Sequence, residues 1–118
     1  MWYVQSPLCK QKWAMEAEQR LLQRVKVKRT KKSKGVMVKF DSTGNLMSTT
    51  EFERFVSRLD GDITFMIGPA DGWATVDDAD YVVSLSKMTF AHELAYIILL
   101  EQLYRVHSIQ HNLPYTRN

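Results

Sequence analysis

Residues 82–105 read VVSLSKMTFAHELAYIILLEQLYR, and this stretch decides the expected fold. Its first five residues, 82–86, contain two valines and a leucine and predict a strand. Apolar residues then recur at helical spacing, which predicts a long helix from near Thr89 or Phe90 to about Gln110. A strand that leads into a long helix is the repeating unit of α/β folds.

The same alternation continues towards the N-terminus. Residues 48–51, Ser-Thr-Thr-Glu, have the spacing of a capping box, which marks the start of a helix. The expected elements are a helix over 14–26, a strand over 36–40, a turn over 41–45, a helix from Ser48 to about Leu59, a strand over 63–67 and a short helical turn over 75–80. Strands that alternate with helices imply a parallel sheet, and 118 residues fit a single domain.

A ligand site is expected where the strands end, because open parallel sheets bind ligands beyond their carboxyl ends. These ends are Phe40-Asp41, Ile67-Gly68 and Leu85-Ser86. Glycine at position 68 would let a ligand approach the backbone closely. Taken alone, however, residues 67–72 are explained more simply as a turn, and the hydroxyls of segment 85–90 as helix caps.

The composition limits the classes of protein and of site. The single cysteine, Cys9, allows neither an internal disulfide nor a cysteine-based zinc site, and it fits a reducing compartment. The longest apolar run, 94–100, is much shorter than the roughly 20 residues of a membrane span, so no membrane association is expected. His107 and His111 share a helix face, but without further ligands they predict no metal site.

Positive charge is concentrated in one segment. Seven cations without an acid lie between positions 24 and 34, whereas the rest of the chain holds 9 basic and 13 acidic residues. They are Arg24, Lys26, Lys28, Arg29, Lys31, Lys32 and Lys34. Such a segment attracts polyanions such as RNA, although a solvated loop would have the same composition.

The C-terminal part resembles a known family. Residues 84–118, SLSKMTFAHELAYIILLEQLYRVHSIQHNLPYTRN, are similar to the end of the RlmH family of SPOUT-class methyltransferases, whose pattern is close to LSxxTxxHxLxRxxLxEQxYRAxxIxxxxPYH. Upstream, FMIGPADGW (65–73) and VKFDSTGNLMSTTEF (38–52) resemble its F-x-IGG-x-x-G-L and LD-x-x-G-x-x-x-SSExF segments. The resemblance is dense over 36–118 and sparse over 14–35.

The resemblance implies a fold and a cofactor. Family members carry a deep C-terminal trefoil knot in a parallel sheet, so residues 36–118 are expected to form the knotted, cofactor-binding region and residues 1–35 a helix plus a basic loop. The cofactor would be S-adenosylmethionine. The positions that match its contacts in the family are Phe40, Gly68, Leu85, Ser86, Lys87, Met88, Thr89 and Phe90.

The resemblance also implies an activity and a partner. Family members methylate a ring nitrogen of a pseudouridine in large-subunit ribosomal RNA, and they work as homodimers through the C-terminal helix. Arg105, Tyr115 and Arg117 match positions that contact the RNA or the target base, and they are the expected catalytic residues. Methyl transfer from a sulfonium needs placement and a deprotonated nitrogen rather than a metal.

Several positions depart from the family pattern. Pro69 replaces the second glycine of the loop, Tyr96 replaces an arginine and Thr116 replaces the terminal histidine. The N-terminal β-α-β segment of the family is expected to be missing or reduced, because little sequence precedes the helix at 14–26.

Three functional hypotheses follow. The first is an S-adenosylmethionine-dependent rRNA methyltransferase, acting in the cytoplasm or, alternatively, in the mitochondrial matrix. The second is an inactive relative that has kept the fold and serves as a ribosome-binding or large-subunit assembly factor, with an organelle as an alternative location. The third is a general RNA-binding module that acts through the basic segment alone.

Overall fold

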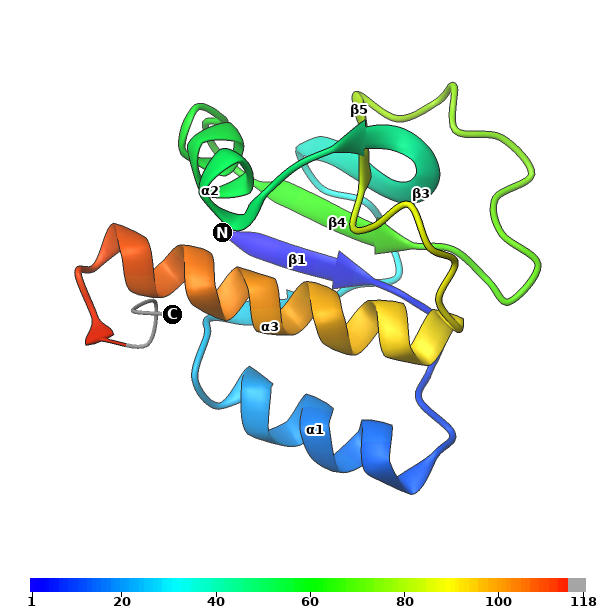
Figure 1. The fold of residues 1–118 in the computed structure, drawn as a ribbon, viewed down its shortest axis with the longest axis horizontal. Coiled ribbons are helices and arrows are strands. Elements are labelled where there is room, and N and C mark those ends of the chain that lie inside the picture. Colours follow the sequence, from blue (N-terminus) through cyan, green and yellow to red (C-terminus); the bar gives the residue numbers. More distant parts are fainter. Residues whose placement is uncertain (115–118) are drawn as a thin grey trace.

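The computed structural model describes residues 1–114, in which five strands form one sheet and three helices accompany it (Figure 1). The elements are β1 (Trp2–Gln5), α1 (Lys12–Leu22), β2 (Val27–Arg29), β3 (Val36–Leu46), α2 (Thr49–Ser57), β4 (Ile63–Ile67), β5 (Tyr81–Ser84) and α3 (His92–Gln110). The strand order is β2-β1-β4-β3-β5, and every pairing is parallel. The predicted α/β fold with a parallel sheet is confirmed.

The helices all lie on one face of the sheet. In the strand order, β2 lies on the same side of β1 as β4 lies of β3. Connections between parallel strands are right-handed, so α1 and α2 both lie on the same face of the sheet. The connections from β2 to β3 and from β4 to β5 run in the opposite direction across the sheet, so they cross its other face. There the backbone N–H of Lys34 donates to Thr64 Oγ1 at 2.8 Å, and the Lys39 ammonium reaches Asp78.

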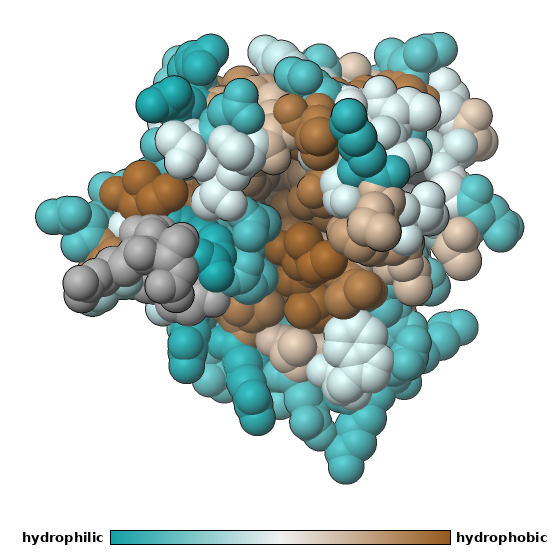
Figure 2. Space-filling model, viewed as in Figure 1, coloured by the Kyte–Doolittle hydropathy of each residue, from teal (hydrophilic) through white to brown (hydrophobic). Residues whose placement is uncertain are grey.

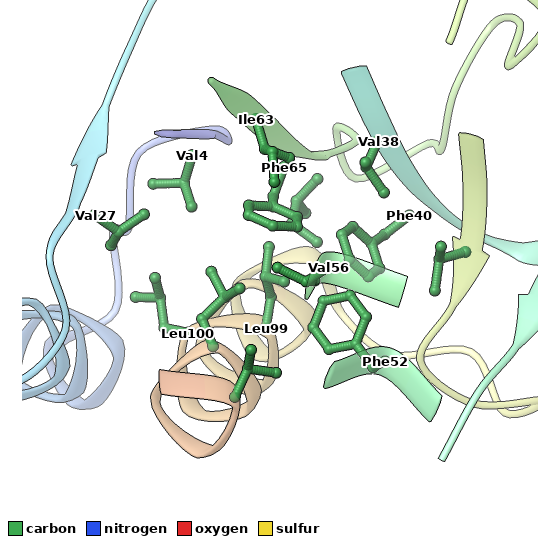
Figure 3. Close-up of a cluster of buried hydrophobic side chains, with 14 of the residues drawn as sticks. Val4, Val27, Val38, Phe40, Phe52, Val56, Ile63, Phe65, Leu99 and Leu100 are labelled. Carbon is green, nitrogen blue, oxygen red and sulfur yellow. The ribbon is translucent and has the colours of Figure 1, made fainter. Parts of the chain in front are cut away.

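The core fills the space between the sheet and α3. Figure 3 shows Val4, Phe65 and Phe40 pointing from three strands towards Leu99 and Leu100 of α3. The Phe65 ring lies 6.1–6.3 Å from the rings of three aromatic neighbours, at centroid distance, and is fully buried. This aromatic and aliphatic cluster ties the outer helices to one continuous core.

The N-terminal region holds more structure than its sequence predicted. The expected helix 14–26 begins and ends earlier, as α1 (Lys12–Leu22), and the residues on either side form strands β1 and β2. Of the two expected alternatives for the N-terminal β-α-β segment, missing or reduced, the structure has the reduced one, with β1 and β2 flanking α1. The strands were missed because they are only four and three residues long.

Strand β3 is longer than the predicted strand 36–40. It pairs with β5 twice, first up to Phe40 and again from Asn45, while the residues between bulge outwards. Asp41 Oδ2 accepts from the Thr43 backbone N–H at 3.0 Å, so the predicted turn forms as a bulge within the strand. A side chain at Gly44 would approach the backbone of Val82 and Val83 to 2.8 Å, so only glycine fits there.

Two other boundaries differ from the sequence predictions. Residues 75–80 form turns, with the Ala79 N–H donating to the Val76 carbonyl at 3.2 Å, and the expected helical turn is absent there. The long helix α3 ends at Gln110 as predicted but begins at His92. None of the helices within residues 1–114 has the length and apolar character needed to cross a bilayer.

Candidate functional site

A cleft of about 250 Å³ opens at the carboxyl edge of the sheet, next to the start of α3. Its lining includes Phe40, Gly68, Leu85, Ser86, Met88, Thr89 and Phe90. Seven of the eight predicted cofactor residues therefore meet in one place, although three separate segments supply them. Lys87 does not line the cleft, and its side chain is exposed.

The segment between β5 and α3 is held by short polar contacts. Ser84 Oγ donates to the Ser86 carbonyl at 2.7 Å, and Ser86 Oγ accepts from the Met88 N–H at 2.9 Å. Ser86 therefore supports a turn at the cleft wall instead of capping α3, whose N-cap residue, Ala91, forms no side-chain cap. Met88 projects at the rim with 73% of its surface exposed.

Trp73 is a cleft residue that the sequence analysis missed. Its indole Nε1–H donates to the Phe40 carbonyl at 3.0 Å, which joins the loop after β4 to the middle of β3. A Cβ atom at Gly68 would lie 3.1 Å from the Trp73 ring, so glycine allows the ring to close over the backbone. The available signal was an aromatic residue placed directly after the glycine loop.

A buried lysine anchors the same loop from the opposite sheet face. Lys39 is 4% exposed, and its ammonium donates to Asp78 Oδ1 at 2.5 Å and to the Thr75 carbonyl at 3.0 Å. The ammonium also lies 4.3 Å from the Trp73 ring centroid, within cation–π range. These contacts hold loop 69–80 against β3 and thereby fix one wall of the cleft.

The cleft carries negative charge. Asp41 and Asp71 both line it, and hydrogen bonds from the Thr43 hydroxyl and backbone N–H lower the pKa of Asp41. A carboxylate with a lowered pKa stays ionised at neutral pH. The partly buried aromatic residues Trp73 and Phe90 complete a site that suits a flat, cationic molecule.

Of the three expected catalytic residues, Arg105 belongs to the described part of the chain, and it does not line the cleft. Arg105 lies 13 residues beyond His92, or about 20 Å along α3, and its Nε donates to Glu101 Oε2 at 2.8 Å. Tyr115 and Arg117 lie outside the described residues. Within one chain, α3 thus separates Arg105 from the cleft.

The basic segment divides into exposed cations and one internal arginine. Six side chains are exposed: Arg24, Lys26, Lys28, Lys31, Lys32 and Lys34. Arg29 instead pairs with Glu18 at 3.0 Å and donates to the Ser6 carbonyl at 2.6 Å. Its guanidinium also lies 5.1 Å from the Tyr96 ring, and the Tyr96 hydroxyl donates to Glu18. Arg29 thus supplies a guanidinium beside the helix position where the family pattern has arginine.

Nearly the whole chain matches one protein family. The family described as "Predicted SPOUT methyltransferase" matches residues 4–116, which include the cleft, the reduced β-α-β segment and α3. The chain belongs to this SPOUT methyltransferase family. The expected family is therefore confirmed.

Several curated relatives of this SPOUT chain carry the name ribosomal RNA large subunit methyltransferase H. The protein from Koribacter versatilis is 43% identical over 86 residues, which cover 68% of this chain and 59% of the relative. The Thermus thermophilus protein is 40% identical over 83 residues, covering 68% and 61%, and the Geobacter sulfurreducens protein is 37% identical over 87 residues, covering 67% and 56%. The chain spans about three fifths of the length of the curated relatives it matches.

Proposed function

We propose that this protein methylates a pseudouridine of large-subunit ribosomal RNA with S-adenosylmethionine as methyl donor. The observation that supports this most is the cleft, in which Gly68, the end of β3 and segment 85–90 come together within a chain of the SPOUT family. The relatives that match it are named for the same modification class.

The cleft residues fit the proposed cofactor. S-adenosylmethionine combines a flat adenine with a positively charged sulfonium and an amino-acid group. The aromatic residues Trp73 and Phe90 suit the adenine ring, and the carboxylates of Asp41 and Asp71 suit the positive charges. The volume of about 250 Å³ is close to the roughly 300 Å³ at which small-molecule sites begin. When bound, the cofactor supplies an activated methyl group.

A homodimer would bring Arg105 to a cleft. Because α3 separates the two within one chain, we propose that Arg105, together with Tyr115 and Arg117, acts in the site of a second copy. Figure 2 shows apolar side chains gathered in the middle of the view, over α3. On α3, Leu94 is 39% exposed, and Ile97 and Ile98 are partly buried. Such a surface on a long helix suits association with a second copy.

The deep trefoil knot remains part of the proposal. The double pairing of β3 with β5 and the close crossing at Gly44 are compatible with it. Pro69 leaves the loop one backbone donor short, yet its carbonyl accepts from the Gly72 N–H at 2.8 Å and closes a turn beside the cleft. The site of action would be that of the ribosome, in the cytoplasm or in the mitochondrial matrix.

Methyl transfer to ribosomal RNA tests the proposal directly. Large subunits that lack the modification are incubated with the protein and S-adenosylmethionine carrying an isotopic label in its methyl group. Label in pseudouridine of the large-subunit RNA is the expected result. Ribosome binding without label would contradict the enzyme proposal and favour the inactive assembly factor. RNA binding with neither label nor ribosome preference would favour the general RNA-binding module.

A further inference from the structure

A second cavity lies at the amino edge of the sheet, at the opposite end of α3 from the cleft. Its volume is about 320 Å³, and it is formed by the connection from α1 to β2 together with His107 of α3. His107 lies 15 residues after His92, which is about 22 Å along the helix. The two cavities are therefore separate sites.

The second cavity is lined by cations. Arg24, Lys26, Lys28 and His107 contribute to its wall, and none of the lining residues is acidic. Among residues 1–114, these three long cations form no ion pair with a carboxylate. The Arg24 guanidinium lies 5.8 Å from the centroid of the Tyr104 ring, which places it beside α3. The arrangement thus concentrates positive charge that the described part of the chain leaves uncompensated.

The pKa of His107 responds to the burial and the charges around this cavity. Burial lowers the pKa of His107, and the neighbouring His111 and Lys26 lower it further. The two imidazole rings lie 4.2 Å apart, between centroids, and His111 Nδ1 is 2.9 Å from the His107 carbonyl oxygen. Positive charge that disfavours a further proton is the environment in which a bound anion is most stabilised.

We propose that this cavity binds a phosphate group of the RNA substrate, an inference that rests on the proposed function. Arginine and lysine bind phosphate oxygens through charge-assisted hydrogen bonds, and a concave wall with several of them fixes the position of the phosphate. The cavity would hold the RNA backbone some 20 Å from the cleft of its own chain, at the end of α3 that carries Arg105.

The proposal assigns different roles to lysines of the same basic segment. Lys26 and Lys28 line the cavity, whereas Lys31 and Lys32 are exposed on the connection that crosses the opposite sheet face. Replacement of either pair by glutamine removes the same charge. The pair Lys31→Gln/Lys32→Gln is thus the matched control for Lys26→Gln/Lys28→Gln.

The affinity for a fluorescent single-stranded oligoribonucleotide is measured by anisotropy across a range of salt concentrations. The cavity pair is expected to weaken binding by about 10-fold and to lower the salt slope by about 0.7 for each lost phosphate contact, with a smaller effect in the control pair. Equal effects of the two pairs would overturn the proposal, because only the total charge would then matter.

Imidazole resonances followed by nuclear magnetic resonance give a second measurement. The RNA is expected to shift the His107 resonances and raise the pKa of His107. A shift of His107 with inorganic phosphate but not with RNA would overturn the assignment to RNA. A separate titration with S-adenosylmethionine distinguishes failure of the proposed enzyme function from failure of the phosphate site.

Discussion

The two ends of the sheet carry opposite charges although one helix joins them. The carboxyl edge holds a cleft with the carboxylates of Asp41 and Asp71 and aromatic walls. The amino edge holds a cavity lined by Arg24, Lys26 and Lys28. A cationic cofactor and an anionic RNA would therefore be attracted to different places. The net charge of +3 does not reveal this, because it sums regions with opposite preferences.

The difference also shows how each site is built. The cleft depends on contacts between segments far apart in the sequence, such as Trp73 with the Phe40 carbonyl. The cavity depends mainly on one short connection, residues 22–28, packed beside α3. Substitutions that loosen the fold should affect the cleft more than the cavity, and local substitutions should affect one site only.

Loss of the core that supports both sites should have the largest effect, and this effect is on stability. Phe65→Ala removes a fully buried ring that contacts three aromatic neighbours, and it is expected to lower the free energy of unfolding by about 3–5 kcal/mol. Urea unfolding followed by circular dichroism measures this loss. Leu8→Ala, at a side chain 72% exposed, is the control and should change stability by less than about 0.5 kcal/mol. Equal effects of the two substitutions would contradict the described core.

A substitution that blocks the cleft should weaken cofactor binding but not RNA binding. Gly68→Trp places a large side chain where a Cβ atom already lies 3.1 Å from the Trp73 ring. The affinity for S-adenosylmethionine is expected to fall about 100-fold, or ~2.7 kcal/mol, while RNA binding is unchanged. Calorimetry and anisotropy measure the two affinities. If Gly68→Trp still binds S-adenosylmethionine with unchanged affinity, the cofactor binds outside this cleft.

A charge on the outer face of α3 tests whether a second copy completes the site. Leu94→Glu is expected to weaken the homodimer at least about 10-fold, since an unpaired carboxylate would enter an apolar contact. Sedimentation over a range of concentrations measures the association. Leu8→Glu adds the same charge on the loop between β1 and α1 and should leave association intact. If Leu94→Glu leaves the dimer unaffected, this face of α3 is not the dimer interface.

Loss of the Lys39 contacts that hold loop 69–80 at the cleft should have the smallest effect on cofactor affinity. Lys39→Met keeps most of the length of the side chain but removes the ammonium that holds Asp78 and the Thr75 carbonyl. Cofactor affinity is expected to fall about 5-fold, or ~1 kcal/mol, with a change in Trp73 fluorescence. Unchanged affinity would show that loop 69–80 is positioned without Lys39.

The same ion pair predicts a pH dependence. The hydrogen bond from Lys39 lowers the pKa of Asp78 below its usual value near 4. Because the folded-state pKa is lowered, the contribution of Asp78 is present above the unfolded value and is lost as the pH falls through the folded one. The acid-induced change in Trp73 fluorescence should therefore occur below pH 4 in the wild-type protein and disappear in Lys39→Met.

Elements with long periodic patterns were predictable from the sequence, and elements defined by tertiary contacts were not. The capping box at Ser48 placed α2, and both of its reciprocal hydrogen bonds form. Strands β1 and β2 are too short for a periodic signal and exist because β4 and β1 pair with them. The glycine loop and segment 85–90 were recognisable as cleft residues through the family pattern. Trp73 and Lys39 were missed because their role depends on a loop that crosses the sheet.

The most direct test of the account is a calorimetric titration of the protein with S-adenosylmethionine. The account predicts saturable binding at micromolar affinity, lost in Gly68→Trp and retained in Lys26→Gln/Lys28→Gln. Absence of binding to the folded protein would contradict the central claim that the cleft at the carboxyl edge holds the methyl donor.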